Sequence, residues 1–269
     1  MTNPTILFSV LFLFLSFVSG GQNAKYSLST DSMVNYHASM KRVYKAVRTQ
    51  NRPRIDGKLQ DGCWLKEGEW QGGFVQQVPD QAKAPSQQTY VKIVYDDDNL
   101  YIALKCLDNE PDKISPLMGR RDDYTSGDVA GIALDTYFDK QTAFEFNVTA
   151  AGQKIDLMHL GAYQWDTNWD AVWEARVGIA DSMWTVEMKI PFTQLRFSSQ
   201  REQTWGMHIW RWIDRLDEED QWKLIPIDAP AMVYIFGELQ GIKDIPRKRH
   251  FEIMPFAAAR YIPSGSKSD

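Results

Sequence analysis

The chain has 269 residues, of which 43% are apolar and 24% are charged, and its net charge at pH 7 is −5. This length suits one large all-β domain or two smaller domains, and the apolar content is sufficient for a core, which argues against a wholly disordered chain. The acidic balance argues against a nucleic-acid partner, because binding to phosphates requires a basic face.

The first 21 residues are predicted to be a signal peptide. The apolar run from Ile6 to Val18 is too short to span a bilayer comfortably, and the small residues at positions 19–21 suit cleavage. The flank before this run lacks Lys and Arg, which departs from the usual pattern of such peptides. No second apolar run of about 20 residues follows, so we expect no transmembrane helix and predict an exported protein.

The chain then changes from patternless to periodic. Residues 22–40 are polar and without a pattern, so we expect a flexible lead-in. Residues 42–49 alternate and predict an edge strand, which ends before Pro53. A short helix is expected after the turn at Asp56 and Gly57.

From residue 89 onward, apolar and polar residues alternate with a period of two. Two hairpins are predicted first, with turns at 96–99 and 139–141, and the aspartates of the first turn are interpreted as turn residues rather than a metal site. The predicted strands cover residues 89–96, 100–107, 129–138, 143–150, 184–192, 205–213 and 221–227. Several short strands separated by turns favour an all-β fold, an antiparallel β-sandwich.

The two cysteines are predicted to be free, buried thiols. Cys106 alternates in phase with Leu100, Ile102 and Leu104, which is typical of a small hydrophobic residue in a core. Cys63 stands in the expected short helix. Export would permit a disulfide between the two, and this alternative stays open.

Three tryptophans, Trp165, Trp169 and Trp173, stand four residues apart. From residue 171 to 179 every second residue is apolar, so Trp173 is predicted to be a core residue of a strand. The residues between Trp165 and Trp169 favour turns and have poor helix propensity, so both are expected in a loop at the rim of the sandwich. There they either stack on a sugar or fold back and close the end of the sandwich.

Several separated motifs resemble the family 9 carbohydrate-binding modules, in matching order and spacing over roughly residues 50–242. The motifs are RIDGKLQDGCW at 54–64, VKIVYDDDNLYIALKCLD at 91–108, GDVAGIALDTYFD at 127–139, WTVEMKIPFTQLRF at 184–197 and FGEL at 236–239. The resemblance implies a jelly-roll-like β-sandwich over residues 41–246 that binds a glycan, without catalysis, in support of carbohydrate catabolism.

Within this family the chain is most similar to long envelope proteins that carry such a domain before an outer-membrane β-barrel. The segments AFEFNVTAAGQKIDL at 143–157 and WDAVWEA at 169–175 are typical of that branch, and residues 247–269 resemble the start of its barrel region. The resemblance therefore implies a location in the periplasm or the outer membrane, with the barrel as a partner in a longer protein.

Family members that bind sugar hold it between two tryptophans, and here the corresponding regions offer only Tyr124 and Tyr234. The charged contacts of the family correspond to Gly131 and Asn147, so the family's sugar site is not retained residue by residue. Bound calcium also occurs in the family, which makes calcium a candidate cofactor with unknown ligands.

We predict a relocated ligand site at the rim of the sandwich, formed by aromatic side chains that stack on a pyranose and by polar neighbours that form hydrogen bonds. The candidates are Tyr124, Trp165 and Trp169 for stacking and Asp123, Asp166 and Asn168 for hydrogen bonds. No catalytic residue is predicted.

Two alternative functions stay open at this point. The first is a structural or interaction domain of an outer-membrane β-barrel protein that binds no sugar, and the missing tryptophan pair favours it. The second is an O-glycosyl hydrolase, which requires two facing carboxylates at a defined separation. No spacing singles out one pair among the carboxylates considered, which are Asp128, Asp135, Glu145, Asp156, Asp166, Asp170 and Glu187. The histidines at 37, 159, 208 and 250 are scattered, which argues against a zinc site.

Overall fold

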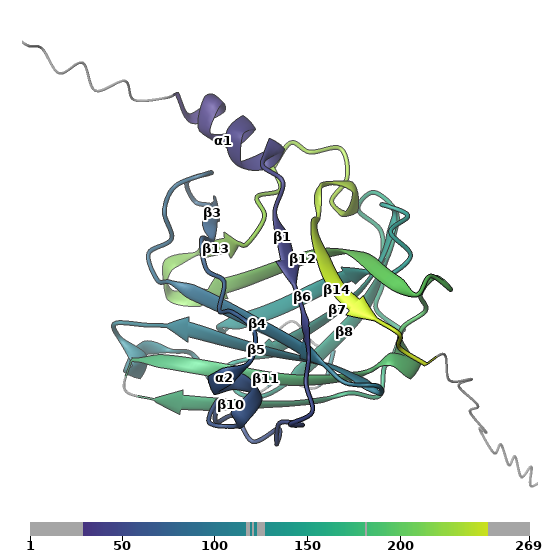
Figure 1. Ribbon diagram of the computed structural model, residues 1–269. Coiled ribbons are helices and arrows are strands. Elements are labelled where there is room, and N and C mark those ends of the chain that lie inside the picture. The colour runs from purple at the N-terminus through teal and green to yellow at the C-terminus, as the bar shows by residue number, and fades with distance from the viewer. Residues whose placement is uncertain (1–28, 117–118, 120, 123–126, 181, 247–269) are drawn as a thin grey trace, which may run out of the picture.

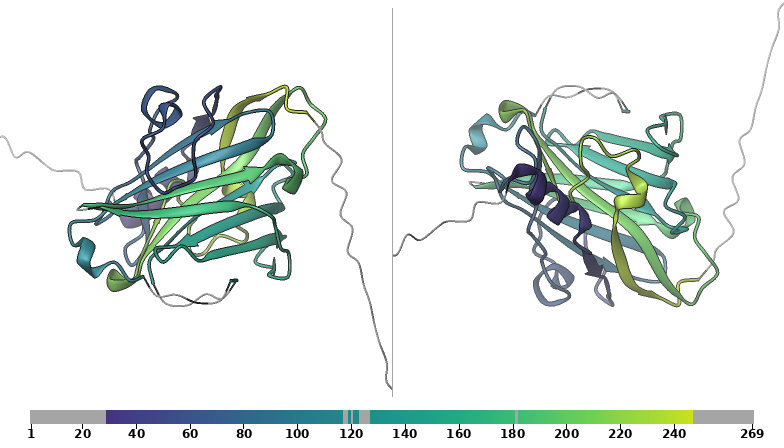
Figure 2. Two further views of the ribbon diagram at one scale, coloured as in Figure 1. Left: turned by 90° about the horizontal axis from the view of Figure 1, so that it is seen from below. Right: turned by 90° about the horizontal axis from the view of Figure 1, so that it is seen from above.

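The computed structural model describes residues 29–246 apart from 117–118, 120, 123–126 and 181. Within them, two β-sheets face each other as a sandwich (Figures 1 and 2). The larger sheet contains, in spatial order, β1 (Val43–Lys45), β14 (Gly237–Lys243), β12 (Glu202–Ile213), β6 (Val129–Asp135), β7 (Thr142–Thr149), β8 (Lys154–Leu160) and β9 (Trp165–Asp166), with β13 (Glu218–Gln221) beside β12 and β3 (Val75–Val78) beside β13. The smaller sheet contains β10 (Glu174–Ala180), β11 (Met183–Pro191), β5 (Asn99–Leu107), β4 (Thr89–Tyr95) and β2 (Val47–Arg48). The predicted β-sandwich is confirmed.

Helices are short and peripheral in the described part of the chain. They are α1 (Thr30–Ser39), α2 (Gly62–Lys66) and the 3₁₀ turns η1 (Pro111–Lys113), η2 (Phe192–Gln194), η3 (Asp214–Leu216) and η4 (Val233–Ile235). The predicted short helix after residue 57 is thus present as α2. Among the described residues, no helix has the length and apolar character needed to cross a membrane.

Aspartate side chains hold the turns of both predicted hairpins. β4 pairs antiparallel with β5, and Asp96 Oδ1 accepts hydrogen bonds from the backbone amides of Asp98 and Asn99 at 2.7 and 2.8 Å. β6 pairs antiparallel with β7, and Asp139 Oδ1 accepts from the backbone amide of Gln141 at 2.8 Å. Both hairpins are confirmed, and Asp96 acts in its turn as predicted.

The core lies between the two sheets and consists of alternate residues of their strands. Ile102 of β5, Ile132 of β6 and Ile209 of β12 are completely buried there. Cys106 belongs to the same core, whereas Cys63 packs on the opposite face of the smaller sheet. Both thiols are buried and unpaired, so the prediction of free cysteines is confirmed. The sheet that separates them accounts for the absence of a disulfide.

The segment predicted as one edge strand forms two short strands, one in each sheet. β1 pairs in parallel with β14 of the larger sheet, and β2 pairs in parallel with β4 of the smaller sheet. Between them, Ala46 N donates to Gln240 O at 2.8 Å. The chain therefore crosses from one sheet to the other within a few residues.

Residues 22–40 were expected to be a flexible lead-in. The structure describes this segment from residue 29 onward, and that part forms helix α1 instead. The Ser29 side chain caps its first turn, which satisfies a free backbone amide. At its other end, Lys223 Nζ donates to His37 O at 3.1 Å and Met40 O at 2.7 Å. The sequence pattern missed this helix because the helix buries none of its own residues and is held by a lysine far along the chain.

Two strand predictions differ from the structure. Residues 221–227 were expected to be a strand, but β13 ends at Gln221. The side-chain oxygen Oε1 of Gln221 accepts a hydrogen bond from Ile225 N at 2.7 Å, and the chain turns onto the outer face of the larger sheet. There Ile225 and Val233 pack beside Ala133. The predicted inward face of residues 171–179 holds through Trp173, just before β10, and Ala175 and Val177 within it, but Ile179 is 58% exposed near the end of this edge strand.

The buried carboxyl of Asp220 in β13 makes the stability of the fold depend on pH. Burial, reinforced by the neighbouring Glu218, raises the pKa of Asp220 to about 8. An unfolded aspartate has a pKa of about 3.9, so the folded protein binds this proton more tightly, and the free energy of unfolding falls as pH rises from about 4 to 8.

We expect Asp220→Asn to remove this dependence, because the amide keeps the shape of the carboxyl without its charge. As pH rises from 5 to 8, the unfolding free energy of the parent should fall relative to that of the variant by about 1–3 kcal/mol. Urea denaturation at each pH measures this difference. Asp217→Asn, at an exposed position nearby, is the matched control and should leave the slope unchanged. Parallel pH profiles for the parent and Asp220→Asn would contradict this account.

Candidate functional site

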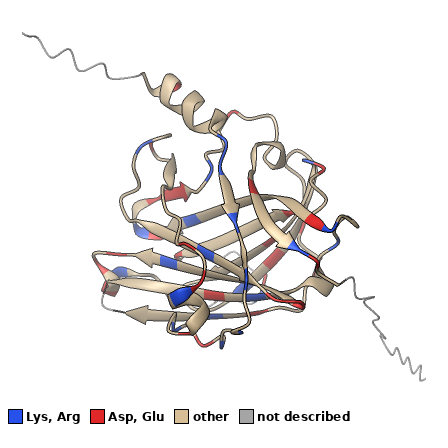
Figure 3. Ribbon diagram, viewed as in Figure 1, with Lys and Arg blue, Asp and Glu red and all other residues tan. Residues whose placement is uncertain are grey.

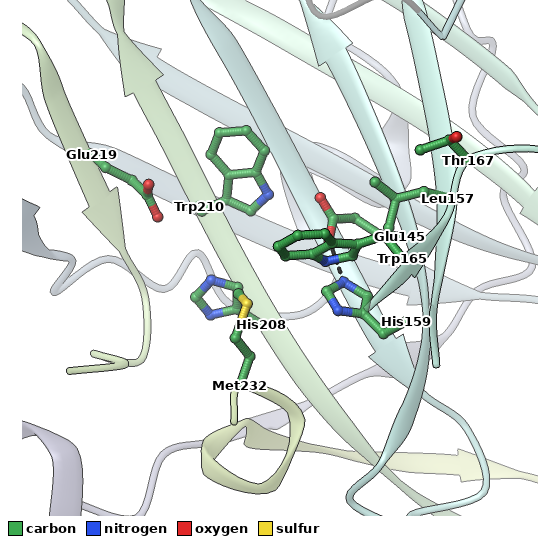
Figure 4. A pocket seen from close by; sticks show the side chains of 9 residues that line it. All are labelled: Glu145, Leu157, His159, Trp165, Thr167, His208, Trp210, Glu219 and Met232. Carbon is green, nitrogen blue, oxygen red and sulfur yellow. Dashed lines mark hydrogen bonds and ion pairs between the residues drawn. The ribbon is translucent and has the colours of Figure 1, made fainter. Parts of the chain in front are cut away.

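A cavity of about 320 Å³ opens on the outer face of the larger sheet (Figure 4). Strands β7, β8, β12 and β13 form its floor, and the β9 segment and the residue before η4 close its sides. The lining residues are Glu145, Leu157, His159, Trp165, Thr167, His208, Trp210, Glu219 and Met232.

Strand register explains why residues far apart in sequence meet here. Gly131 of β6 stands opposite both Trp210 of β12 and Asn147 of β7. A Cβ atom at Gly131 would lie 1.7 Å from Asn147 Oδ1 and 2.8 Å from Trp210 Nε1. Only glycine therefore lets these two side chains converge across β6.

A buried ion pair lies at the floor of the cavity. His159 Nε2 lies 2.5 Å from Glu145 Oε2, and Asn147 Nδ2 donates to Glu145 Oε1 at 2.7 Å. Burial opposes ionisation of Glu145, but the hydrogen bonds from His159 and Asn147 outweigh it and hold the pKa of this carboxyl below its usual range. The carboxylate is therefore ionised at neutral pH.

The other two titratable residues of the cavity are His208 and Glu219. Burial lowers the pKa of His208 to about 4, so its imidazole is neutral at pH 7, and it stacks on Phe236 with ring centroids 5.3 Å apart. Glu219 accepts a hydrogen bond from Gln221 Nε2 at 2.7 Å. Burial, and secondarily the charge of Glu145, raises the pKa of Glu219.

The tryptophans singled out in the sequence lie on different sides of the sheet edge. Trp165, 49% exposed, belongs to β9 rather than to a loop, pairs with His159 in the ladder and lines the cavity. Trp169 is half-buried and packs inward on Phe144 and Phe146, with ring centroids 5.0 and 5.6 Å apart. The structure therefore separates the two tryptophans, and Trp169 closes the edge of the sandwich.

Of the remaining candidates, Asp166 and Asn168 do not line this cavity. Asn168 N donates to Asp166 Oδ1 at 3.0 Å, so these two form a local turn after β9. Asp123 and Tyr124 lie outside the described residues. Tyr234 is exposed on η4 and borders a separate depression beside Lys41 and Lys223.

Sequence reasoning missed Trp210 and Glu219 as members of this site. Trp210 falls on the opposite face of β12 from the buried Trp205 and Ile209, and an indole on a polar face was the available signal. Trp210 and Trp165 line the same cavity only because of the strand order in the larger sheet, which a single sequence does not reveal.

Most carboxylates considered for hydrolysis hold the backbone in place. Asp135 accepts from the backbone amides of Asp139 and Lys140, and Glu187 accepts from Trp64 Nε1 at 2.7 Å. Asp156 accepts from Ala171 N at 2.6 Å and from the indole of Trp173. Among the described residues, no group of three or more His, Cys, Asp or Glu side chains is placed to hold a metal ion.

Comparison with known families identifies the fold. The model of the carbohydrate family 9 binding domain-like family matches residues 55–230, which is well over half of the chain. The chain belongs to this family.

Solved structures agree with this family 9 assignment. A family 9 carbohydrate binding module from Caldicellulosiruptor kristjanssonii in complex with cellotriose has a TM-score of 0.54 and 17% identity over 80% of this chain and 100% of its own. The complex of such a module with glucose has a TM-score of 0.53 and 16% identity over 77% and 100%. A candidate carbohydrate-binding protein from Bacteroides uniformis has a TM-score of 0.61 and 13% identity over 75% and 99%. A comparison with curated proteins finds no significant match.

The Glu145–His159 pair should stabilise this family 9 domain, because removing His159 leaves the buried Glu145 carboxylate without one of its two hydrogen-bond partners. We expect His159→Phe to lower the free energy of unfolding by about 2–4 kcal/mol at pH 7, measured by urea denaturation. The stabilisation of Glu145 is present above its unfolded pKa of about 4.3 and is lost as pH falls through its lower folded pKa, so the difference should shrink at pH 3.

His208→Phe is the matched control, because it removes a neutral imidazole from the same cavity wall. Its loss at pH 7 should be smaller than that of His159→Phe. Because burial lowers the pKa of His208 from 6.5 to about 4, its own loss should also shrink at pH 3, so the two variants are compared at pH 7. Equal losses in the two variants at pH 7 would show that the Glu145–His159 pair adds nothing specific.

Proposed function

We propose that this domain binds a glycan, without catalysis, in the cavity between Trp165 and Trp210. The observation that carries the proposal is the convergence of two indoles and two carboxylates on one cavity, with each indole coming from a different part of the chain (Figure 4). Indole faces suit the apolar face of a pyranose, and carboxylates accept hydrogen bonds from its hydroxyl groups.

The size and lining of the cavity support this proposal. Its volume of about 320 Å³ lies at the lower end of the range of ligand pockets, which suits a small sugar unit. Leu157 and Met232 add apolar wall, and Thr167 adds a hydroxyl group at its edge. The combination of apolar walls and few polar groups is typical of small-molecule sites.

Family membership also supports the proposal. The similar modules from Caldicellulosiruptor kristjanssonii are complexes with cellotriose and with glucose, which makes β-glucan oligosaccharides the first ligands to test. The missing tryptophans at the family's positions would be replaced here by Trp165 and Trp210.

We expect Trp165→Ala and Trp210→Ala each to weaken binding of cellotriose at least about tenfold, because each loses one stacking face. Titration calorimetry measures the dissociation constant, and near-ultraviolet circular dichroism checks the fold. Tyr36→Ala, which removes an exposed ring on α1, is the matched control and should bind like the parent. Unchanged affinity in both tryptophan variants would rule out this cavity.

We further propose that the protein is exported to the periplasm or the outer membrane, serves carbohydrate catabolism and precedes a β-barrel in a longer protein. The apolar run from Ile6 to Val18 and the barrel-like motif in residues 247–269 support this. Fractionation of cells that produce the native protein should recover it in the envelope, cleaved near residue 21. Recovery of an uncleaved cytosolic protein would contradict the proposal.

The structural or interaction domain is the second candidate. The departure from the family's charged positions at Gly131 and Asn147 favours it. It predicts a folded protein that binds no glycan in the same calorimetric series.

A further inference from the structure

One of the two carboxylates in the cavity, Glu145, is paired with His159, whereas Glu219 contacts no basic side chain among the described residues. The lining of the cavity includes Glu145 and Glu219, two histidines and no Lys or Arg within the described residues. Figure 3 shows both Lys and Arg and Asp and Glu along the ribbon outside the cavity. His159 contacts Glu145, and the charge of Glu145 in turn acts on Glu219.

The two carboxylates differ in what they can offer to a ligand. Both oxygens of Glu145 are engaged, one by His159 and one by Asn147. Glu219 accepts from Gln221 with Oε1, and no hydrogen bond from the described residues reaches its Oε2. Glu219 therefore has a free acceptor, and its side chain lies beside Trp210 in the cavity (Figure 4).

An acceptor with this charge, next to an indole, suits a cation. A hydrogen bond from an ammonium group to a carboxylate is roughly twice as strong as one between neutral groups. The face of an indole also attracts a nearby cation. A ligand carboxylate would instead meet the Glu219 carboxylate, with no Lys or Arg in the described lining to offset the repulsion.

We propose that this cavity selects amino sugars, with the ligand ammonium on Glu219 and the sugar ring between Trp165 and Trp210, and rejects uronic acids. The inference rests on the proposed glycan binding at the same cavity. It adds the charge class of the ligand, which neither the family nor the similar structures specify.

Three β-1,4-linked trisaccharides with the same backbone test the selection: cellotriose, fully deacetylated chitotriose and the trimer of glucuronic acid. Calorimetry with the full-length chain, at a pH where the chitotriose amines are protonated and at low salt, should give chitotriose at least about tenfold tighter binding than cellotriose. The glucuronic acid trimer should bind weakest. Because the contact is electrostatic, added salt should reduce the chitotriose advantage and leave cellotriose binding almost unchanged.

The variant Glu219→Gln tests the contribution of the Glu219 carboxylate alone. The amide is nearly isosteric but uncharged, so the variant should bring the ratio of chitotriose to cellotriose affinity close to one, whatever its effect on the cellotriose affinity itself. Glu174→Gln is the matched control, because it removes the same charge from β10 of the smaller sheet and should keep the full ratio.

The outcomes distinguish the inference from the function on which it rests. Binding of cellotriose without a chitotriose advantage, or an advantage that survives in Glu219→Gln, overturns the amino-sugar selection and leaves glycan binding standing. If Glu174→Gln loses the tighter binding of chitotriose to the same extent as Glu219→Gln, the preference comes from the overall charge of the protein, and the selection by Glu219 is also overturned. No binding of any of the three by a folded protein overturns both proposals.

Discussion

The period-two geometry of β-strands, with one face committed to the core, is the constraint on which the site depends. Once Ile132, Phe146 and Ile209 pack against the smaller sheet, the residues that alternate with them must face outward. This places Glu145 and Trp210 on the outer face of the larger sheet. The cavity is therefore a consequence of how the hydrophobic core is packed.

The loop after β8 shows how a buried carboxylate positions part of the site. Asp156, completely buried, accepts hydrogen bonds from Ala171 N and the indole of Trp173, and Arg121 pairs with it at 2.8 Å. These contacts fix the far end of the loop against the core. With both ends of the loop held, Trp169 turns inward and Trp165 stays on the outer face. Asp156 thus acts on the site without lining it.

Much of the fold could be predicted because its signals are local. The alternation in β4 to β7 and the aspartates at their turns identify the hairpins, and the phase of Cys106 identifies a buried thiol. Features that depend on distant partners could not be read this way. Helix α1 depends on Lys223, and the cavity depends on β9 and β12 lying in one sheet. The sequence singled out Trp165, which lines the cavity from β9 rather than from the expected loop. Trp210, which lines the same cavity, becomes visible only when the strand order is known.

The crossing of the chain from β1 to β2 bears on where this domain begins and ends. β1 is bonded to β14 and β2 to β4, so strands from both ends of the described chain complete the two sheets. The segment recognised by the family model, residues 55–230, contains neither β1 and β2 nor β14. A fragment cut to that segment would leave the edges of β12 and β4 unpaired and open to other chains. The smallest piece that keeps every strand of the two sheets runs from Val43 to Lys243, so the segment recognised by sequence is shorter than the segment that builds the sandwich.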